Sequence, residues 1–220
     1  MSLPSSTSRR TGDLQMTTAE PIRFLPPESP EDNARADLYA LIATLFFAPP
    51  SAQLLDSLAE ADEIVGEDDT VPLAEAWSAL QAACAVADEE AVQQEYDDLL
   101  VGVGKAVVPP YVGAHATHIG GDTLLVELKG FLAARGLGRQ TSVNEPEDHI
   151  AALCEVMRHL VAIQRAEIAE QREFFERFIL PGAPQLCGAI EAAAEANFYK
   201  VVARFAAAFI DLERTAFEME

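Results

Sequence analysis

Apolar residues recur three and four positions apart along most of the chain after residue 30. The first such segment places them at Leu38, Leu41, Ile42, Leu45 and Phe46. This spacing puts them on one face of an α-helix. Ser29 and Pro30 are typical of a helix start, as a cap and a first-turn proline, and Pro49-Pro50 predicts where the helix ends.

The same periodicity predicts helices along most of the remaining chain. They span about 51–58, 73–86, 88–100, 122–134, 145–180 and 184–213. Residues 101–108 are the only candidate for a strand, and their glycines and Lys105 argue against one. The pattern therefore predicts an all-α, single-domain helical bundle of about eight or nine helices.

Two breaks interrupt the helical pattern. Residues 101–119 hold several glycines and Pro109-Pro110, and a loop this long in a helical domain is usually functional or clamps two elements together. A second break precedes Glu145 and predicts a hinge within 136–148. Residues 1–28 are rich in Ser, Thr and Pro and predict a disordered tail, which leaves 29–220 as the helical domain.

The chain is strongly acidic, with a formal net charge of −21. Between Arg35 and Lys105 there are 15 acidic residues and no Lys or Arg. Such a surface repels phosphates, so we do not expect nucleic-acid binding. Two interpretations remain open: a solvated face that keeps the protein soluble, or a docking face for a cationic peptide.

Neither a membrane span nor a disulfide framework is expected from the sequence. No apolar run approaches the roughly 18–20 residues of a membrane-spanning helix. Cys84, Cys154 and Cys187 are widely separated and lack zinc-ligand spacing, which favours reduced core thiols in a cytosolic protein. Ser8-Arg9-Arg10 looks like the start of a twin-arginine export signal, but no apolar segment follows it directly, so we do not expect it to direct export.

The segment from Glu145 to His149 places the carboxylates of Glu145, Glu147 and Asp148 beside Pro146. An acid/base cluster, a metal site and a helix-start hinge would all fit these residue types. Asn144 as a cap and Pro146 in the first turn would explain the segment as a helix start. His149 is left unexplained, because Ser or Ala would serve a helix start as well. Neighbours on a helix point about 100° apart, so Asp148 and His149 would not form a catalytic dyad.

A second group of polar residues raises the alternative of a helical metal-dependent hydrolase. His115 and His118 are three apart, Asp122 follows four residues later, and His149 could join them. The neighbouring glycines argue against a regular helix at this position. Gly102-Val103-Gly104 lacks both the third glycine and the preceding strand of a dinucleotide site, so it is weak evidence for nucleotide binding.

Several motifs, taken in order, resemble the TorD/DmsD family of molybdoenzyme-specific chaperones, also called redox enzyme maturation proteins. They are the helix Arg35–Phe46 before Pro49-Pro50, the segment Glu95–Gly104, the turn Pro109-Pro110-Tyr111, the hinge Glu145–Ile150, and the pairs Phe174-Phe175 and Phe198-Tyr199. The resemblance covers about residues 30–215.

The resemblance implies a cytoplasmic, non-enzymatic, TorD-like chaperone without a cofactor of its own. Such proteins bind the twin-arginine signal peptide or the apo form of a molybdopterin oxidoreductase subunit, assist cofactor insertion and prevent premature export. The family includes monomers and domain-swapped homodimers, and guanine-nucleotide binding has been proposed for some members. The resemblance implies client contact at Tyr96, Pro109, Pro110, Tyr111, Glu145, Pro146, Asp148 and His149. The acidic interval would complement a cationic leader.

Overall fold

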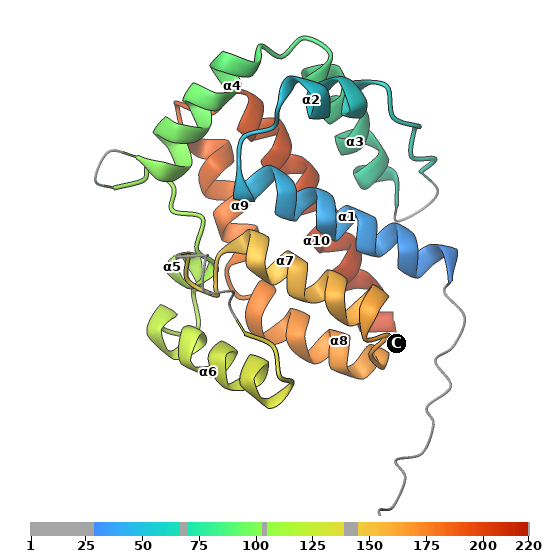
Figure 1. The fold of residues 1–220 in the computed structure, drawn as a ribbon, viewed down its shortest axis with the longest axis vertical. Helices are drawn as coiled ribbons and strands as arrows, with labels where there is room; N and C mark the ends of the chain where they lie inside the picture. Colours follow the sequence, from blue (N-terminus) through green and yellow to red (C-terminus); the bar gives the residue numbers. More distant parts are fainter. Residues whose placement is uncertain (1–28, 67–69, 103–104, 139–144, 220) are drawn as a thin grey trace, which may run out of the picture.

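The computed structural model describes residues 29–66, 70–102, 105–138 and 145–219 and shows an all-α fold (Figure 1). The predicted tail 1–28 and residues 139–144 of the predicted hinge lie outside the described residues. Ten α-helices occur in the described part: α1 (Pro30–Phe47), α2 (Ala52–Ala59), α3 (Val71–Cys84), α4 (Glu89–Tyr96), α5 (Val112–His115), α6 (Gly121–Ala134), α7 (Ile150–Arg158), α8 (Ile168–Phe174), α9 (Ala183–Ala192) and α10 (Phe198–Met219). Three π-helical turns extend α4, α7 and α8, namely η2 (Asp97–Val101), η3 (His159–Ile163) and η4 (Phe175–Ile179).

Local capping chemistry sets the starts of the first helices, as the sequence predicts. The Ser29 hydroxyl accepts a hydrogen bond from the Asp32 N–H at 2.9 Å, and Ser51 does the same for Leu54 at 3.3 Å. α1 ends at Phe47, just before the two prolines. The bounds predicted for the first helices are therefore confirmed to within a few residues.

The core forms where α1 lies along α7 and where α10 packs against α3 and α9 (Figure 1). Trp77 of α3 meets Phe205 of α10, with ring centroids 5.6 Å apart. All three cysteines are free and buried, and burial raises the pKa of Cys84 to about 11 and that of Cys187 to about 12. These thiols are packing residues. None of the described helices is long and apolar enough to span a membrane.

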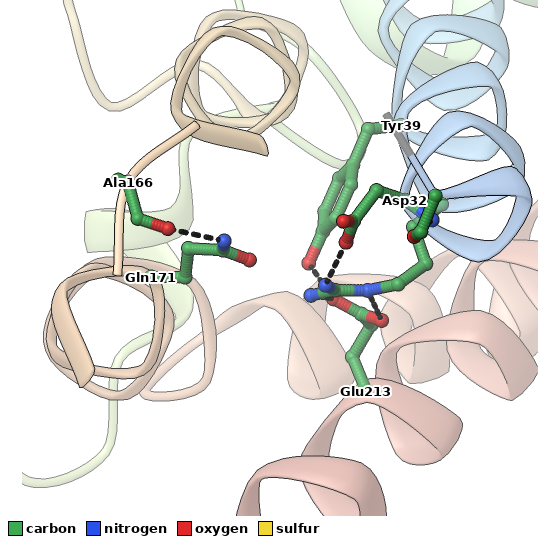
Figure 2. Close-up of polar contacts among 7 residues, drawn as sticks. Asp32, Tyr39, Ala166, Gln171 and Glu213 are labelled. Carbon is green, nitrogen blue, oxygen red and sulfur yellow. Dashed lines mark hydrogen bonds and ion pairs between the residues drawn. The ribbon is translucent and has the colours of Figure 1, made fainter. Parts of the chain in front are cut away.

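A buried ion pair joins the first helix to the last (Figure 2). The Arg35 guanidinium donates to both carboxylate oxygens of Glu213, each at 2.8 Å, and the Tyr39 hydroxyl donates to Oε2 at 2.8 Å. Asp32 adds a longer contact to Arg35 at 3.4 Å. The Glu213 side chain is 3% exposed, so its charge is stabilised mainly by these donors.

The helical character predicted to continue through 145–180 is interrupted. The chain forms α7 with η3, leaves the helical path at 164–167, and resumes as α8 with η4. Arg165 has a positive φ of 49°, a left-handed backbone that ends a helical run. Residues 164–173 consist almost entirely of Ala, Glu, Gln and Arg, which favour a helix, and this is why the sequence pattern does not show the break.

The predicted single helix over 184–213 is also wrong, because α9 and α10 are separated by 193–197. A carboxylate from elsewhere in the chain caps the second helix. Glu95 accepts the N–H groups of Asn197 and Tyr199 at 2.8 Å and that of Phe198 at 3.0 Å. This long-range cap satisfies the first backbone N–H groups of α10.

The loop predicted over 101–119 contains the short helix α5, which the sequence analysis missed. Glycines allow backbones to approach there. A Cβ on Gly182 would collide with the carbonyl oxygen of Val112, and one on Gly121 would lie 2.7 Å from the Gly113 oxygen. α5 is therefore wedged between the starts of α6 and α9, beside the predicted hinge.

Candidate binding groove

An open groove of about 760 Å³ lies between the C-terminal half of α1, the start of α2, the end of α6 and residues 145–159. Its wall is largely apolar. Phe47, Leu54, Leu137, Ala152 and Val156 line it, together with several prolines and alanines. The Phe47 side chain is 59% exposed, although aromatic side chains of this size usually pack inside. The groove can thus receive an apolar segment of a partner.

Acidic residues stand among the apolar lining. Glu145, Glu147 and Glu155 line the groove, against Arg158 and His159. Glu147 also forms an ion pair with Lys129 at 3.5 Å, and Glu155 pairs with Arg158 at 2.9 Å. Carboxylates outnumber cations here, so a cation beside an apolar segment would be favoured.

The segment before α7 is fastened to the 109–113 turn by backbone hydrogen bonds. Tyr111 and His149 form an isolated antiparallel bridge. The Val112 N–H donates to the Asp148 carbonyl at 2.9 Å, and the Ile150 N–H donates to the Pro110 carbonyl at 3.0 Å. These contacts bring two predicted site segments together and hold one end of the groove.

His149 caps α7. Its Nδ1 accepts the Ala151 N–H at 3.1 Å, and its ring packs edge-on against Tyr111 with centroids 5.6 Å apart. The prediction that Pro146 lies in the first helical turn is wrong, because the helix begins at Ile150; the predicted cap Asn144 lies outside the described residues. His149, which helix-start reasoning left unexplained, is the capping residue.

Asp148 points away from solvent toward α5. The residue is 7% exposed, and its Oδ2 accepts the Gly113 N–H at 3.2 Å. Burial raises the pKa of this carboxyl, and the hydrogen bond from Gly113 opposes the shift. A Cβ on Gly113 would lie 2.7 Å from Oδ2, so a larger residue there would displace the Asp148 carboxylate. Asp148 thus positions the groove segment.

Tyr111 and Glu145 form a hydrogen bond at the rim. The Tyr111 hydroxyl donates to Glu145 Oε2 at 2.5 Å. Burial and this neighbouring carboxylate raise the pKa of Tyr111 to about 12, so the phenol stays protonated and continues to donate. The bond fixes a Glu145 oxygen at the edge of the groove.

Three other predicted site residues hold the backbone around the groove. The Tyr96 hydroxyl donates to the Phe47 carbonyl at 2.9 Å and to the Phe46 carbonyl at 3.2 Å, at the end of α1. The Pro110 carbonyl accepts the hydrogen bond from the Ile150 N–H, and the Pro109 carbonyl oxygen lies 2.8 Å from His115 Nε2. Of the eight predicted residues, Glu145, Pro146 and His149 line the groove directly.

Comparison with known proteins identifies the family. The family model for the nitrate reductase delta subunit matches residues 67–188. A perchlorate reductase assembly chaperone protein from Dechloromonas aromatica (strain RCB) is 30% identical over 152 residues, which cover 64% of this chain and 67% of that protein. The chain belongs to the TorD/DmsD family of molybdoenzyme-specific chaperones. The resemblance read from the sequence motifs is confirmed, and the chain is a molybdoenzyme assembly chaperone.

The structure of this TorD/DmsD chaperone does not assemble the metal site that the sequence left open. Throughout the described ranges there is no group of three or more His, Cys, Asp or Glu side chains that could hold a metal ion. His115 lies against the Pro109 carbonyl, and His149 caps α7. The described residues therefore provide no metal site for the hydrolase alternative.

Sequence reasoning missed the apolar wall of the chaperone's groove. Phe47, Leu54 and Val156 come from three helices far apart in the chain, and only packing brings them together. One signal was available in the pair Phe46-Phe47. Adjacent helical side chains point about 100° apart, and here Phe46 is fully buried while Phe47 is exposed.

The buried histidine gives the chaperone a pH-dependent stability. Burial lowers the pKa of His149, so the unfolded chain binds a proton more readily than the folded chain. The neutral His149 ring makes its full contribution to stability above the pKa that it has in the unfolded chain, about 6.5. This contribution is lost as the pH falls toward the lower pKa of His149 in the folded chain.

We expect His149→Asn, which keeps a capping side chain but does not titrate, to remove this loss. Urea unfolding of both proteins between about pH 7.5 and 5.5 gives their free energies of unfolding. As the pH falls, the wild type should lose more of this free energy than the variant does. The titration of Asp148 cancels in the comparison, because both proteins retain it. A difference that stays constant with pH would contradict the expectation.

Proposed function

We propose that this chaperone binds the twin-arginine signal peptide of a molybdopterin oxidoreductase subunit in the α1–α7 groove. The observation that carries the proposal is the combination of an exposed apolar wall with three carboxylates in one groove. A leader of this class has paired arginines followed by an apolar stretch. The arginines would meet the carboxylates, and the apolar stretch would cover Phe47 and its neighbours.

Holding the leader in the groove would keep the subunit in the cytoplasm until its cofactor is inserted. The molybdopterin cofactor belongs to the client, and the chaperone acts without catalysis. The names of the matching family and relative, which refer to nitrate and perchlorate reductases, favour a reductase catalytic subunit as the client. The strongly negative charge of the chain would speed the encounter with a cationic leader.

The groove is tested with a labelled synthetic peptide that carries paired arginines and an apolar stretch of about 15 residues. We expect Phe47→Ser to weaken binding about tenfold, because one large apolar contact of about 1.4 kcal/mol is lost. Fluorescence anisotropy titration measures the affinity. Val86→Ser is the matched control, because Val86 is 84% exposed and lies outside the groove.

Two outcomes of this titration would count against the proposal. Equal affinities for the Phe47→Ser and Val86→Ser proteins would remove the groove as the site. Binding that does not weaken as salt rises from about 0.03 to 0.3 M would remove the role of the carboxylates, since screening shortens the Debye length over this range. Pull-down of the client subunit with and without its leader separates leader binding from binding of the mature body.

A further inference from the structure

The apolar wall of the groove is left uncovered by the described residues. Phe47 lines the groove and is 59% exposed, whereas most of the other aromatic side chains in the described ranges are buried. An exposed apolar groove favours association with any segment of matching chemistry. A chaperone that carries such a groove between clients needs something to cover it.

The first 28 residues of the chain have the chemistry that the groove favours. Residues 1–12 contain Arg9 and Arg10 and no acidic residue, and Ile22-Arg23-Phe24-Leu25 places an arginine within an apolar run. The rest of the chain, 29–220, holds 12 Lys and Arg against 33 Asp and Glu, a net charge of −21. The segment is thus the part of the chain best suited to an acidic, apolar groove.

The connection is long enough. α1 runs from Pro30 toward the groove, whose lining begins at Ala43, about 20 Å along the helix. Phe24 precedes Pro30 by six residues, which extend to about 20 Å, and Arg10 precedes it by twenty, which extend to about 65 Å. A chain folding back along α1 therefore brings the apolar run to the near end of the groove and the arginines well beyond it.

We propose that residues 1–28 occupy the α1–α7 groove of their own chain while no client is bound. The apolar run covers the near end of the groove, beside Ala43 and Thr44, and the paired arginines face Glu145 and Glu155. The client leader then displaces a tethered competitor. A tether of this length holds the segment at an effective concentration of about 1 mM, so even a weak segment lowers the apparent leader affinity severalfold.

Occupancy is tested directly in the full-length chain with a photoreactive benzoylphenylalanine in place of Phe24. We expect irradiation to give a cross-link within one chain to a groove-lining residue of α1 or α7, such as Thr44 or Ala152, identified by mass spectrometry. An excess of the synthetic leader peptide should reduce it. Cross-links between two chains, or only to surfaces outside the groove, would overturn the proposal.

Competition is tested with the variant Arg9→Ala/Arg10→Ala/Phe24→Ala/Leu25→Ala, which should bind the labelled leader peptide about 2–10-fold more tightly than the wild type. Thr17→Ala/Thr18→Ala is the control and should not change the affinity. Unchanged affinity in the quadruple variant would overturn the competition.

The competition experiment depends on the proposed function, because it measures leader binding in the groove. The cross-linking experiment does not depend on it. Leader binding without a cross-link in the groove refutes self-occupancy alone. A cross-link without any leader binding refutes the proposed function alone.

Discussion

Replacing Glu213 by alanine is expected to lower the free energy of unfolding by about 3–5 kcal/mol, the cost of leaving one partner of a buried ion pair without the other. Arg35, whose side chain is 15% exposed, would lose a two-pronged contact, and the Tyr39 hydroxyl would lose its acceptor. Guanidinium unfolding followed by circular dichroism measures the change.

The control for Glu213 is an exposed carboxylate on the same helix. Glu218 pairs with Arg214 at 3.0 Å at the surface, so Glu218→Ala should cost less than about 1 kcal/mol. The double variant Arg35→Met/Glu213→Leu should recover much of the loss, because it removes both buried charges together. Similar stabilities for the Glu213→Ala and Glu218→Ala proteins would show that the buried pair is not a major support.

Glu95→Ala is expected to cost about 2–3 kcal/mol, because charge-assisted hydrogen bonds to three backbone N–H groups are lost at the start of α10. Glu95→Gln keeps one acceptor oxygen, so the stability of this variant should lie between those of the wild type and the Glu95→Ala protein. Urea unfolding gives the stabilities, and amide exchange at 197–199 should speed up first.

Gln94→Ala is the neighbouring control, since Gln94 is exposed on the same helix. A Glu95→Ala protein as stable as the Gln94→Ala protein would mean that water satisfies the first turn of α10 equally well. The contact of Glu95 with α10 would then follow from the packing between α4 and α10 and would not itself stabilise the helix start. The family motif Glu95–Gly104 would in that case have a role other than capping.

Local chemistry made the first helices predictable, and long-range contacts limited the prediction elsewhere. Ser29, Ser51 and the paired prolines act on their own neighbours, so their effect is visible in the sequence. The start of α10 depends on Glu95, about a hundred residues earlier, and no local pattern could show it. The break after η3 was hidden because the residues across it, 164–173, are almost all helix-favouring types.

The candidate site was predictable in its segments but not in the roles of its residues. Sequence reasoning found both the 109–111 turn and the 145–149 segment, which the structure brings together. It could not show that Asp148 turns inward to Gly113, because that contact depends on α5. It also missed the cap that His149 provides for α7, which is a local hydrogen bond from the Ala151 N–H. Client contact by any of these residues stays a prediction.

The ion pair between Arg35 and Glu213 also bears on how the chain is made. Synthesis proceeds from the N-terminus, so α1 emerges from the ribosome long before the residue that neutralises Arg35. The first helix, which also forms one wall of the groove, therefore waits for the last one before its buried face is complete. A newly made chain completes the buried face of its first helix only when almost all of it has been translated.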